Sequence, residues 1–233
     1  MKRLIVVDVD GTLTDEKGNI HSRVVKKLEE LRDAGYDVIL SSGNGYAILV
    51  GLAYYLPVKR FVIAENGGVI GYRKDMKILG NPSIALKARE KILKLKGDII
   101  VESWQNRYRI VDLAFRPKPG TLSLEEAYKV IQCLLEDEKE VRVENSGWAI
   151  HVRDASIDKG KGLLATCLSL GYDVKEAIAI GDSITDLSMF KVAGFSIAVA
   201  NSPEILKRAA SFVTVSSYHE GFIEAANYIL KNF

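Results

Sequence analysis

Short apolar runs alternate with amphipathic stretches through the first 64 residues of the chain. Three of these runs predict buried strands, and they are Leu4–Val7, Val38–Leu40 and Phe61–Ala64. Between them, residues 22–34 and Tyr46–Leu56 predict helices, with Ser22 expected to cap the first. Strands that alternate with helices in this way are typical of βαβ units and a parallel sheet.

The pattern changes near residue 80. Strands and helices are now grouped differently, and the predicted elements are a helix at Ser83–Leu95, strands at Ile99–Glu102 and Arg107–Phe115, a helix at Leu124–Leu135, and strands at Val141–Glu144 and Trp148–Val152. The sequence Asn145-Ser146-Gly147 between the last two strands is typical of a hairpin turn. We therefore expect residues 80–155, called the insert below, to form a small separate α+β domain.

The alternation of helices and strands resumes after the insert. The predicted elements are helices at Lys159–Leu170, Ile184–Val192, Pro203–Ala209 and Gly221–Leu230, and strands at Ala177–Ile180, Phe195–Val199 and Phe212–Val215. The predicted fold class is therefore α/β. A Rossmann-like core of residues 1–79 and 156–233, built on a parallel sheet, would carry the inserted α+β domain.

Composition narrows the possible partners. The chain has 233 residues, of which 48% are hydrophobic, and a formal net charge of +2. This charge is too small to favour nucleic acid or an anionic membrane surface. No apolar run approaches the roughly 20 residues needed to span a bilayer, and the start of the chain does not resemble a signal peptide. We expect a cytoplasmic protein that is either a monomer or a homodimer, and the sequence does not choose between the two.

Polar residues follow three of the predicted strands. Asp8 and Asp10 follow the first strand, Ser42 and Gly43 the second, and Asp182 and Asp186 the strand that begins at Ala177. In open α/β sheets ligands bind outside the carboxyl ends of the strands, so these residues are expected to share one crevice. Clustered carboxylates repel one another unless a cation joins them, and a site with only oxygen ligands favours Mg²⁺.

Lys159 is a second indication of an anionic ligand. It begins a predicted helix in the run IDKGKG, where a cation opposes the helix dipole. The position becomes favourable if an anion binds between the lysine and the helix N-terminus. Lys161, two residues on, competes for the same role, and Ser42 could instead cap the helix after it. An anion, a divalent cation and a carboxylate together favour phosphoryl transfer.

Two other groups of residues have no expected role in the site. His21, His151 and His219 lack the spacing of a metal site, and Trp104 and Trp148 are expected in the core of the insert.

These motifs together resemble the haloacid dehalogenase superfamily of aspartyl phosphatases, in its Cof-like branch. They are DVDGTLT, the serine of SSGN, the lysine of DKGKG, and GDSITDLSM, in that order, with ENGG and AVAN as further likenesses. The resemblance implies that Asp8 is the nucleophile and Asp10 the general acid and base. It implies Mg²⁺ ligands at Asp8, Asp10 (through its carbonyl) and Asp182, with Asp186 a ligand or an anchor for one.

By the same resemblance, Ser42, Gly43 and Lys159 hold the phosphoryl oxygens. Asn44 stands where arginine is common in the family and is expected to alter substrate contacts. The small insert resembles the reduced caps of archaeal phosphoglycolate phosphatases. The implied reaction is therefore hydrolysis of a small phosphorylated metabolite, 2-phosphoglycolate first. Four arginines are candidates for binding its carboxylate, and they are Arg107, Arg109, Arg116 and Arg142.

Three alternatives remain open. A sugar phosphatase or a phosphomutase of the same superfamily would share every core motif. A receiver-like domain, phosphorylated on aspartate as a switch, would also combine acids, a hydroxyl and a lysine, but it would lack the second aspartate and the insert.

Overall fold

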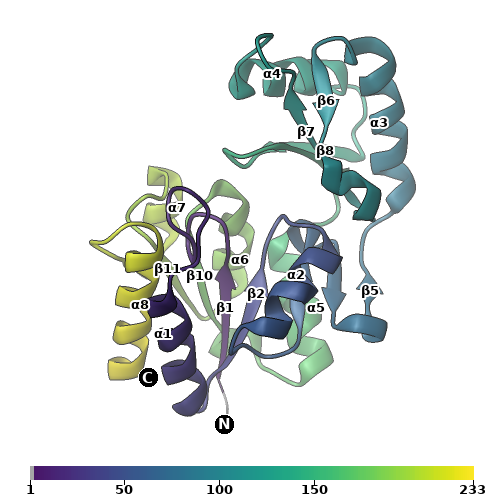
Figure 1. Ribbon diagram of the computed structural model, residues 1–233. Helices are drawn as coiled ribbons and strands as arrows, with labels where there is room; N and C mark the ends of the chain where they lie inside the picture. The colour runs from purple at the N-terminus through teal and green to yellow at the C-terminus, as the bar shows by residue number, and fades with distance from the viewer. Residues whose placement is uncertain (1–2) are drawn as a thin grey trace.

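The computed structural model describes residues 3–233 and contains two β-sheets (Figure 1). The larger sheet has eight strands in the order β12-β11-β10-β1-β2-β3-β4-β5. Its parallel strands are β1 (Leu4–Asp8), β2 (Asp37–Ser41), β3 (Val62–Ala64), β10 (Ile178–Gly181), β11 (Phe195–Ala198) and β12 (Phe212–Val213). At one edge, β4 (Val69–Gly71) and β5 (Lys77–Ile78) pair antiparallel, so the sheet is not parallel throughout.

Helices cover both faces of the larger sheet. On one face lie α1 (Ser22–Asp33), α2 (Tyr46–Tyr55) and α8 (Tyr218–Asn232), and on the other α5 (Lys159–Leu170), α6 (Leu187–Val192) and α7 (Glu204–Ala209). The central strand β1 serves both layers because its side chains alternate: Ile5 and Val7 join the first apolar cluster, Leu4 and Val6 the second. A strand buried on both faces explains why Leu4–Val7 is apolar throughout.

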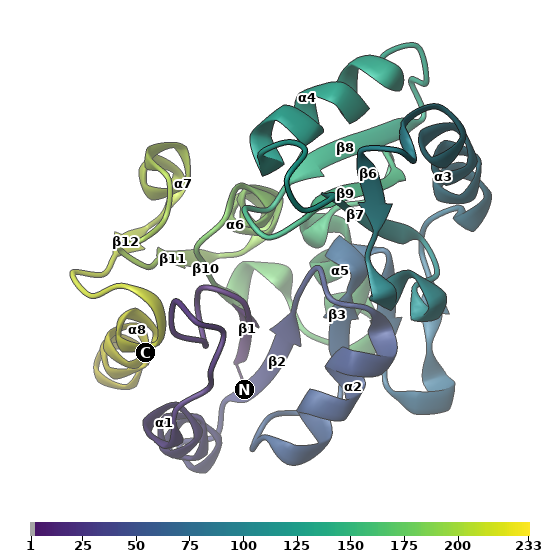
Figure 2. The same cartoon turned by 45° about the horizontal axis from the view of Figure 1, so that its top comes forward.

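The insert forms the smaller, antiparallel sheet, in the order β6-β7-β9-β8. Its elements are α3 (Pro82–Lys96), β6 (Ile100–Glu102), β7 (Asp112–Pro117), α4 (Leu124–Leu134), β8 (Val141–Asn145) and β9 (Ile150–Asp154). The helices α3 and α4 pack on the face of this sheet that is turned away from the core (Figure 2). A separate apolar cluster, which includes Ile92, Phe115, Ile131 and Ile150, holds these layers together.

Short 3₁₀ turns link several elements. They are η1 (Glu65–Gly67), η2 (Arg73–Asp75), η3 (Trp104–Tyr108), η4 (Val174–Glu176) and η5 (Ile184–Asp186). Within residues 3–233, no helix is long and apolar enough to cross a bilayer.

The structure confirms the predicted α/β class with a parallel-dominated central sheet. The boundaries of the insert at residues 80 and 155 stay a prediction, which the separate second sheet supports. Two local expectations were wrong. The N-cap of α1 is His21 rather than Ser22, and no side chain caps that helix. The first part of the predicted strand Arg107–Phe115 belongs to the 3₁₀ turn η3, and β7 begins only at Asp112.

Strand order locates a crevice. From β1 the chain proceeds outward through β2 to β3, whereas β10, the neighbour on the other side of β1, leads outward to β11 and β12. A topological switch point of this kind opens a crevice at the carboxyl ends of the two central strands. The insert lies above this edge of the sheet (Figure 1).

Candidate active site

Asp8 is the last residue of β1, and a tight turn follows it. The carbonyl of Val9 accepts a hydrogen bond from the backbone N–H of Leu13 at 2.9 Å, which closes the turn. Gly11 lies in this turn with φ of 89°, and a Cβ there would lie 2.3 Å from Asp182 Oδ2. Only glycine meets both conditions, because other residues rarely adopt this φ and there is no space for a side chain. The glycine therefore lets the β1 turn approach the acid that follows β10.

Three carboxylates gather at the switch point. Asp8, Asp182 and Asp186 each offer an oxygen atom, and these atoms lie within 4.8 Å of one another. The Thr12 hydroxyl donates to Asp182 Oδ1 at 2.8 Å, and the Asn201 amide donates to Asp182 Oδ2 at 3.3 Å. Asp186 is fixed by the turn itself, since the backbone N–H groups of Asp182 and Ser183 both donate to its Oδ2.

Lys159 provides the cation of the cluster. Its Nζ lies 2.6 Å from Asp8 Oδ1 and 2.6 Å from Asp186 Oδ1, and its side chain is 2% exposed. Lys161 is exposed and donates to the carbonyl of Ser156. The structure therefore places Lys159, and not Lys161, beside the acids.

Burial and mutual repulsion dominate the electrostatics. Burial raises the pKa of Asp8 well above its ordinary value; the Lys159 ammonium opposes this effect, and neighbouring carboxylates add to it. Burial and the Asp186 carboxylate likewise raise the pKa of Asp182 to about 7. Burial opposes the charge on Lys159, but Asp186 and Asp8 outweigh it and raise the pKa of the ammonium. The cluster is thus short of positive charge despite its lysine.

The loop after β2 contacts Asp10. The Ser42 hydroxyl lies 3.3 Å from Asp10 Oδ2 and accepts a hydrogen bond from the Asn44 backbone N–H at 3.0 Å. The Asn44 side-chain amide donates to the same Asp10 oxygen at 2.7 Å. Ser42 is not a helix cap, because the N-cap of α2 is Gly45 and no side chain caps that helix.

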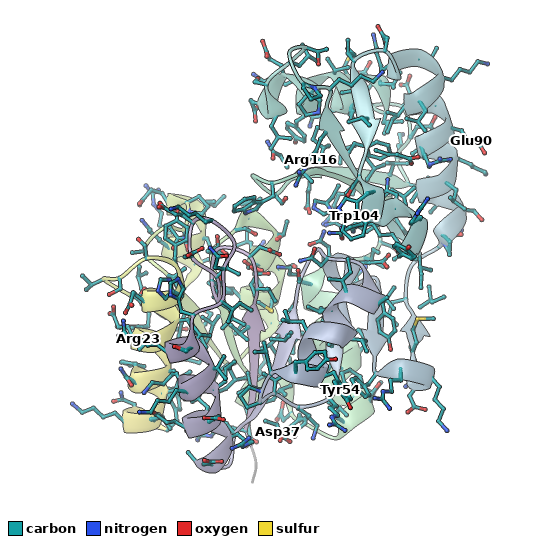
Figure 3. The ribbon with its side chains drawn as sticks, in the orientation of Figure 1. Arg23, Asp37, Tyr54, Glu90, Trp104 and Arg116 are labelled. Carbon is teal, nitrogen blue, oxygen red and sulfur yellow. The ribbon has the colours of Figure 1, made fainter. Side chains whose placement is uncertain are left out.

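A cavity of about 210 Å³ lies between the core and the insert. The core contributes Asp8, Asp10, Gly43, Asn44 and Lys159 to its walls, among others, and the insert contributes Gln105, Arg109, Arg116, Ser146, Trp148 and His151, among others. Figure 3 shows Arg116 on the side of the insert that faces the core.

One wall of the cavity depends on a glycine. A Cβ at Gly43 would lie 3.1 Å from Asn66 Nδ2 and 3.1 Å from His151 Cε1. His151 is held in place by Asp112, whose Oδ1 lies 2.9 Å from His151 Nδ1, and the Asn66 amide donates to the same carboxylate at 2.5 Å. The absence of a side chain at Gly43 therefore brings loop and insert close together.

The structure brings the predicted acids, Ser42, Gly43 and Lys159 to this edge of the sheet, and of the four candidate arginines only Arg109 and Arg116 line the cavity. It also adds several residues that the sequence did not single out. Thr12 and Asn201 hold Asp182, and Gln105 contacts the loop after β2. The AVAN run was a sign of Asn201; nothing in the sequence indicated Gln105.

Both tryptophans of the insert were wrongly expected in its core. Trp148 is 47% exposed and lines the cavity, and Trp104 is 69% exposed and packs edge-on against Tyr108 within η3. Trp104 begins η3, and Trp148 lies in the turn between β8 and β9. Neither belongs to the apolar cluster that holds α3 and α4 on the sheet of the insert.

Comparison with known proteins identifies the family. The family model of haloacid dehalogenase-like hydrolases matches residues 5–110 and 121–225. The chain belongs to this family, as its motifs predicted. It is 33% identical over 228 residues to a phosphoglycolate phosphatase of Methanospirillum hungatei, covering 96% of this chain and 95% of that one. It is 37% identical over 229 residues to a phosphoglycolate phosphatase of Archaeoglobus fulgidus, covering 97% and 96%.

Solved structures share the fold. A Thermoplasma acidophilum protein superposes with a TM-score of 0.86 at 24% identity, covering 98% of both chains. A sugar phosphatase of haloacid dehalogenase subclass IIB superposes with a TM-score of 0.77 at 18% identity, covering 98% of this chain and 99% of that one.

Proposed function

We propose that this hydrolase is a Mg²⁺-dependent phosphatase of small phosphomonoesters that works through a phosphorylated Asp8. The observation that carries the proposal is the contact of Lys159 with both Asp8 and Asp186 at the switch point of the sheet. A carboxylate nucleophile needs no base to activate it, but it repels a phosphate dianion. The Lys159 ammonium and a divalent cation held by the acidic cluster would overcome this repulsion.

The donor set fits Mg²⁺. The three carboxylates of Asp8, Asp182 and Asp186 and the one ammonium of Lys159 have a net charge of −2 when all are ionised. One divalent cation would balance this charge. All three groups offer oxygen, the atom that Mg²⁺ prefers. Asp8 and Asp182 would hold the ion, with the Asp10 carbonyl as a third ligand, while Asp186 would anchor Lys159 and the turn around Asp182. A bound Mg²⁺ would neutralise charge on the phosphoryl group.

The protein groups then divide the chemistry between them. An Asp8 oxygen forms a bond to phosphorus as the bond to the leaving oxygen breaks. Asp10 gives its proton to that oxygen, and an acyl phosphate remains on Asp8. In the second step Asp10 takes a proton from water, the water oxygen attacks phosphorus, and Asp8 and inorganic phosphate are released. Ser42, the Gly43 backbone and Lys159 would hold the phosphoryl oxygens throughout, as charge-assisted or neutral hydrogen-bond donors.

The most favoured substrate is 2-phosphoglycolate. A cavity of about 210 Å³ is small beside the roughly 300–1,000 Å³ of drug-sized ligand sites, which favours a short substrate. Arg109 and Arg116 line its walls. Arg109 already donates to Gln105 and to the Asp112 carbonyl, so Arg116 is the arginine that a second anionic group on the substrate would give a partner. Arg107 stacks on Tyr108 instead, and Arg142 lies near Glu144 and Asp158. The names of the archaeal relatives support the same substrate.

A sugar phosphatase is the second candidate, because one of the solved proteins with this fold is a sugar phosphatase. The two are separated by kcat/KM values for phosphoglycolate, hexose phosphates and an aryl phosphate, measured with Mg²⁺. We expect phosphoglycolate to be preferred. A hexose phosphate that is better by about tenfold, or about 1.4 kcal/mol, would rule out phosphoglycolate and leave the phosphatase mechanism intact. Transfer of phosphate to a second hydroxyl instead of water would indicate a phosphomutase.

The cytoplasmic location and the choice between monomer and homodimer stay predictions. The receiver-like alternative is disfavoured, since the chain belongs to a hydrolase family and carries an insert over the site.

A further inference from the structure

A line of hydrogen bonds connects the insert to Asp10. The Gln105 amide donates to Asn44 Oδ1 at 3.2 Å, and the Asn44 amide donates to Asp10 Oδ2 at 2.7 Å. Gln105 comes from η3 in the insert, 61 residues along the chain from Asn44. The insert therefore touches the proposed acid and base through a single intervening side chain.

The first bond fixes the direction of the second. An asparagine side chain has a carbonyl oxygen at one end and an NH₂ group at the other. Because Gln105 donates to the oxygen of Asn44, the NH₂ group of Asn44 faces Asp10, and it also donates to Ser42 Oγ at 3.0 Å. If Gln105 stopped donating, the amide could turn over and place its oxygen against the Asp10 carboxylate, which is repulsive.

Gln105 is itself held in one orientation. Its Oε1 accepts a hydrogen bond from Arg109 Nη2 at 3.2 Å and from the Gly45 backbone N–H at 3.4 Å, so its NH₂ group is left for Asn44. Arg109 donates to the carbonyl of Asp112 at 3.1 Å, and its side chain is 3% exposed. The orientation of Gln105 therefore depends both on a buried arginine of the insert and on the backbone of the core.

These contacts all reach one oxygen of Asp10. Ser42 and Asn44 lie against Oδ2, and among residues 3–233 no hydrogen-bond donor contacts Oδ1. Because only Oδ2 of Asp10 is held by hydrogen bonds in the described part of the chain, Oδ1 is available to face the cavity, which Asp10 lines. That is the arrangement an acid needs in order to meet a leaving oxygen.

We infer that Asn44 and Gln105 are positioning residues that aim Asp10 at the leaving group when the insert lies over the core. This inference rests on the proposed function, because it assumes that Asp10 is the general acid. It gives Asn44 a role in aiming the acid, in addition to the effect on substrate contacts expected from the sequence. Catalysis then depends on the contact between Gln105 of the insert and the core as well as on substrate binding.

The test uses leaving groups of different quality. Proton donation matters most for an alkyl phosphate, whose alkoxide leaves poorly, and little for 4-nitrophenyl phosphate. We expect Gln105→Glu and Asn44→Ala to lower kcat/KM for phosphoglycolate by roughly tenfold or more, a part of the roughly 10²–10⁴-fold that general acid catalysis supplies. For 4-nitrophenyl phosphate their kcat/KM should stay within about threefold of wild type. Gln105→Glu keeps the acceptor for Arg109, replaces the donor to Asn44 by a carboxylate oxygen, and adds one negative charge.

Controls separate this inference from the proposed function. Trp104→Ala changes an exposed residue of the same turn and should affect neither substrate. Asp10→Asn should show the full dependence on the leaving group, and circular dichroism should show that each variant is folded. If Asp10→Asn shows that dependence while Gln105→Glu and Asn44→Ala lower both substrates equally or not at all, the inference is wrong and the proposed function stands. If Asp10→Asn itself shows no such dependence, the assignment of Asp10 fails, and the inference fails with it.

Discussion

Lys159 Nζ lies 2.6 Å from Asp8 Oδ1, although the two residues are 151 positions apart in the chain. β1 ends at Asp8 and α5 begins at Lys159, so the pair joins a strand end to a helix start across the crevice. A buried ion pair of this kind is costly to form and costly to break from one side only. Its position at the switch point links it to the proposed phosphoryl transfer.

Lys159→Ala should reduce activity far more than Lys161→Ala. Removing one charge-assisted contact to the phosphoryl group is expected to cost roughly 2–4 kcal/mol in transition-state stabilisation, by analogy with a single oxyanion donor. The exposed Lys161 should matter little. The measurement is kcat/KM for an aryl phosphate, with thermal unfolding of both variants as the control, because Lys159→Ala also leaves Asp8 and Asp186 without their cation. Equal and small losses would show that the phosphate binds elsewhere.

Activity should require Mg²⁺ and disappear with a chelator. The three carboxylates of Asp8, Asp182 and Asp186 leave a deficit of positive charge that the divalent ion would fill. Ca²⁺ should substitute poorly, because its larger and looser coordination shell would misplace the nucleophile. The check is phosphate release before and after chelation, with Mg²⁺ added back. Full activity in excess chelator is incompatible with the metal assignment.

Arg116→Ala should raise the KM for phosphoglycolate and leave the KM for 4-nitrophenyl phosphate nearly unchanged. Arg116 lines the cavity and makes no ion pair within residues 3–233, so it is available to a substrate carboxylate. A hydrogen bond to a charged group contributes roughly 1.5–3 kcal/mol, which corresponds to about 13- to 160-fold in kcat/KM. Arg142→Ala is the matched control, since Arg142 lies near Glu144 and Asp158 instead. Similar losses for both substrates would show that Arg116 does not determine the preference for phosphoglycolate.

Stability should fall in acid partly because of Asp112. Burial raises the pKa of this carboxyl, but His151, Arg109 and Arg153 outweigh burial and bring the pKa to about 2. The group is therefore more acidic folded than unfolded, and the stability it contributes is present above about pH 4 and lost as pH falls toward 2. The difference from the ordinary value of 3.8 corresponds to roughly 2 kcal/mol.

The measurement for Asp112 is urea unfolding between about pH 5 and pH 2. Asp112→Asn should flatten the fall in unfolding free energy, and Asp98→Asn, at an exposed position, should leave it unchanged. An undiminished fall in Asp112→Asn would mean that other groups carry the acid sensitivity.

The parts of the site that the sequence predicted are those attached to strand ends. Asp8 and Asp182 could be placed because parallel strands bring their carboxyl ends to one edge, and Lys159 because a cation at a helix start needs an explanation. The sequence did not predict Gln105 as a site residue, because its contact with Asn44 depends on how the insert packs against the core. The same long-range packing put Trp148 at the cavity wall rather than in the core of the insert.

The wrong start of the strand at Arg107 has a long-range cause. The run from Arg107 to Phe115 contains enough β-branched and aromatic residues to resemble one strand, yet its first part belongs to η3. After η3, the backbone N–H groups of Ile110, Val111 and Asp112 donate to the buried Glu65 carboxylate instead of a neighbouring strand. A buried acid from another part of the chain thus replaces strand pairing, and no local pattern reports it.

The most direct test of the proposed mechanism is the site at which phosphate attaches to the protein. Asp10→Asn should still accept phosphate from 4-nitrophenyl phosphate and hydrolyse the product slowly, so the acyl phosphate should accumulate. Mass spectrometry of the acid-quenched and digested variant is expected to find phosphate on Asp8, and the double variant with Asp8→Asn should carry none. Phosphate on any other residue, or wild-type turnover in Asp8→Asn alone, would contradict the account.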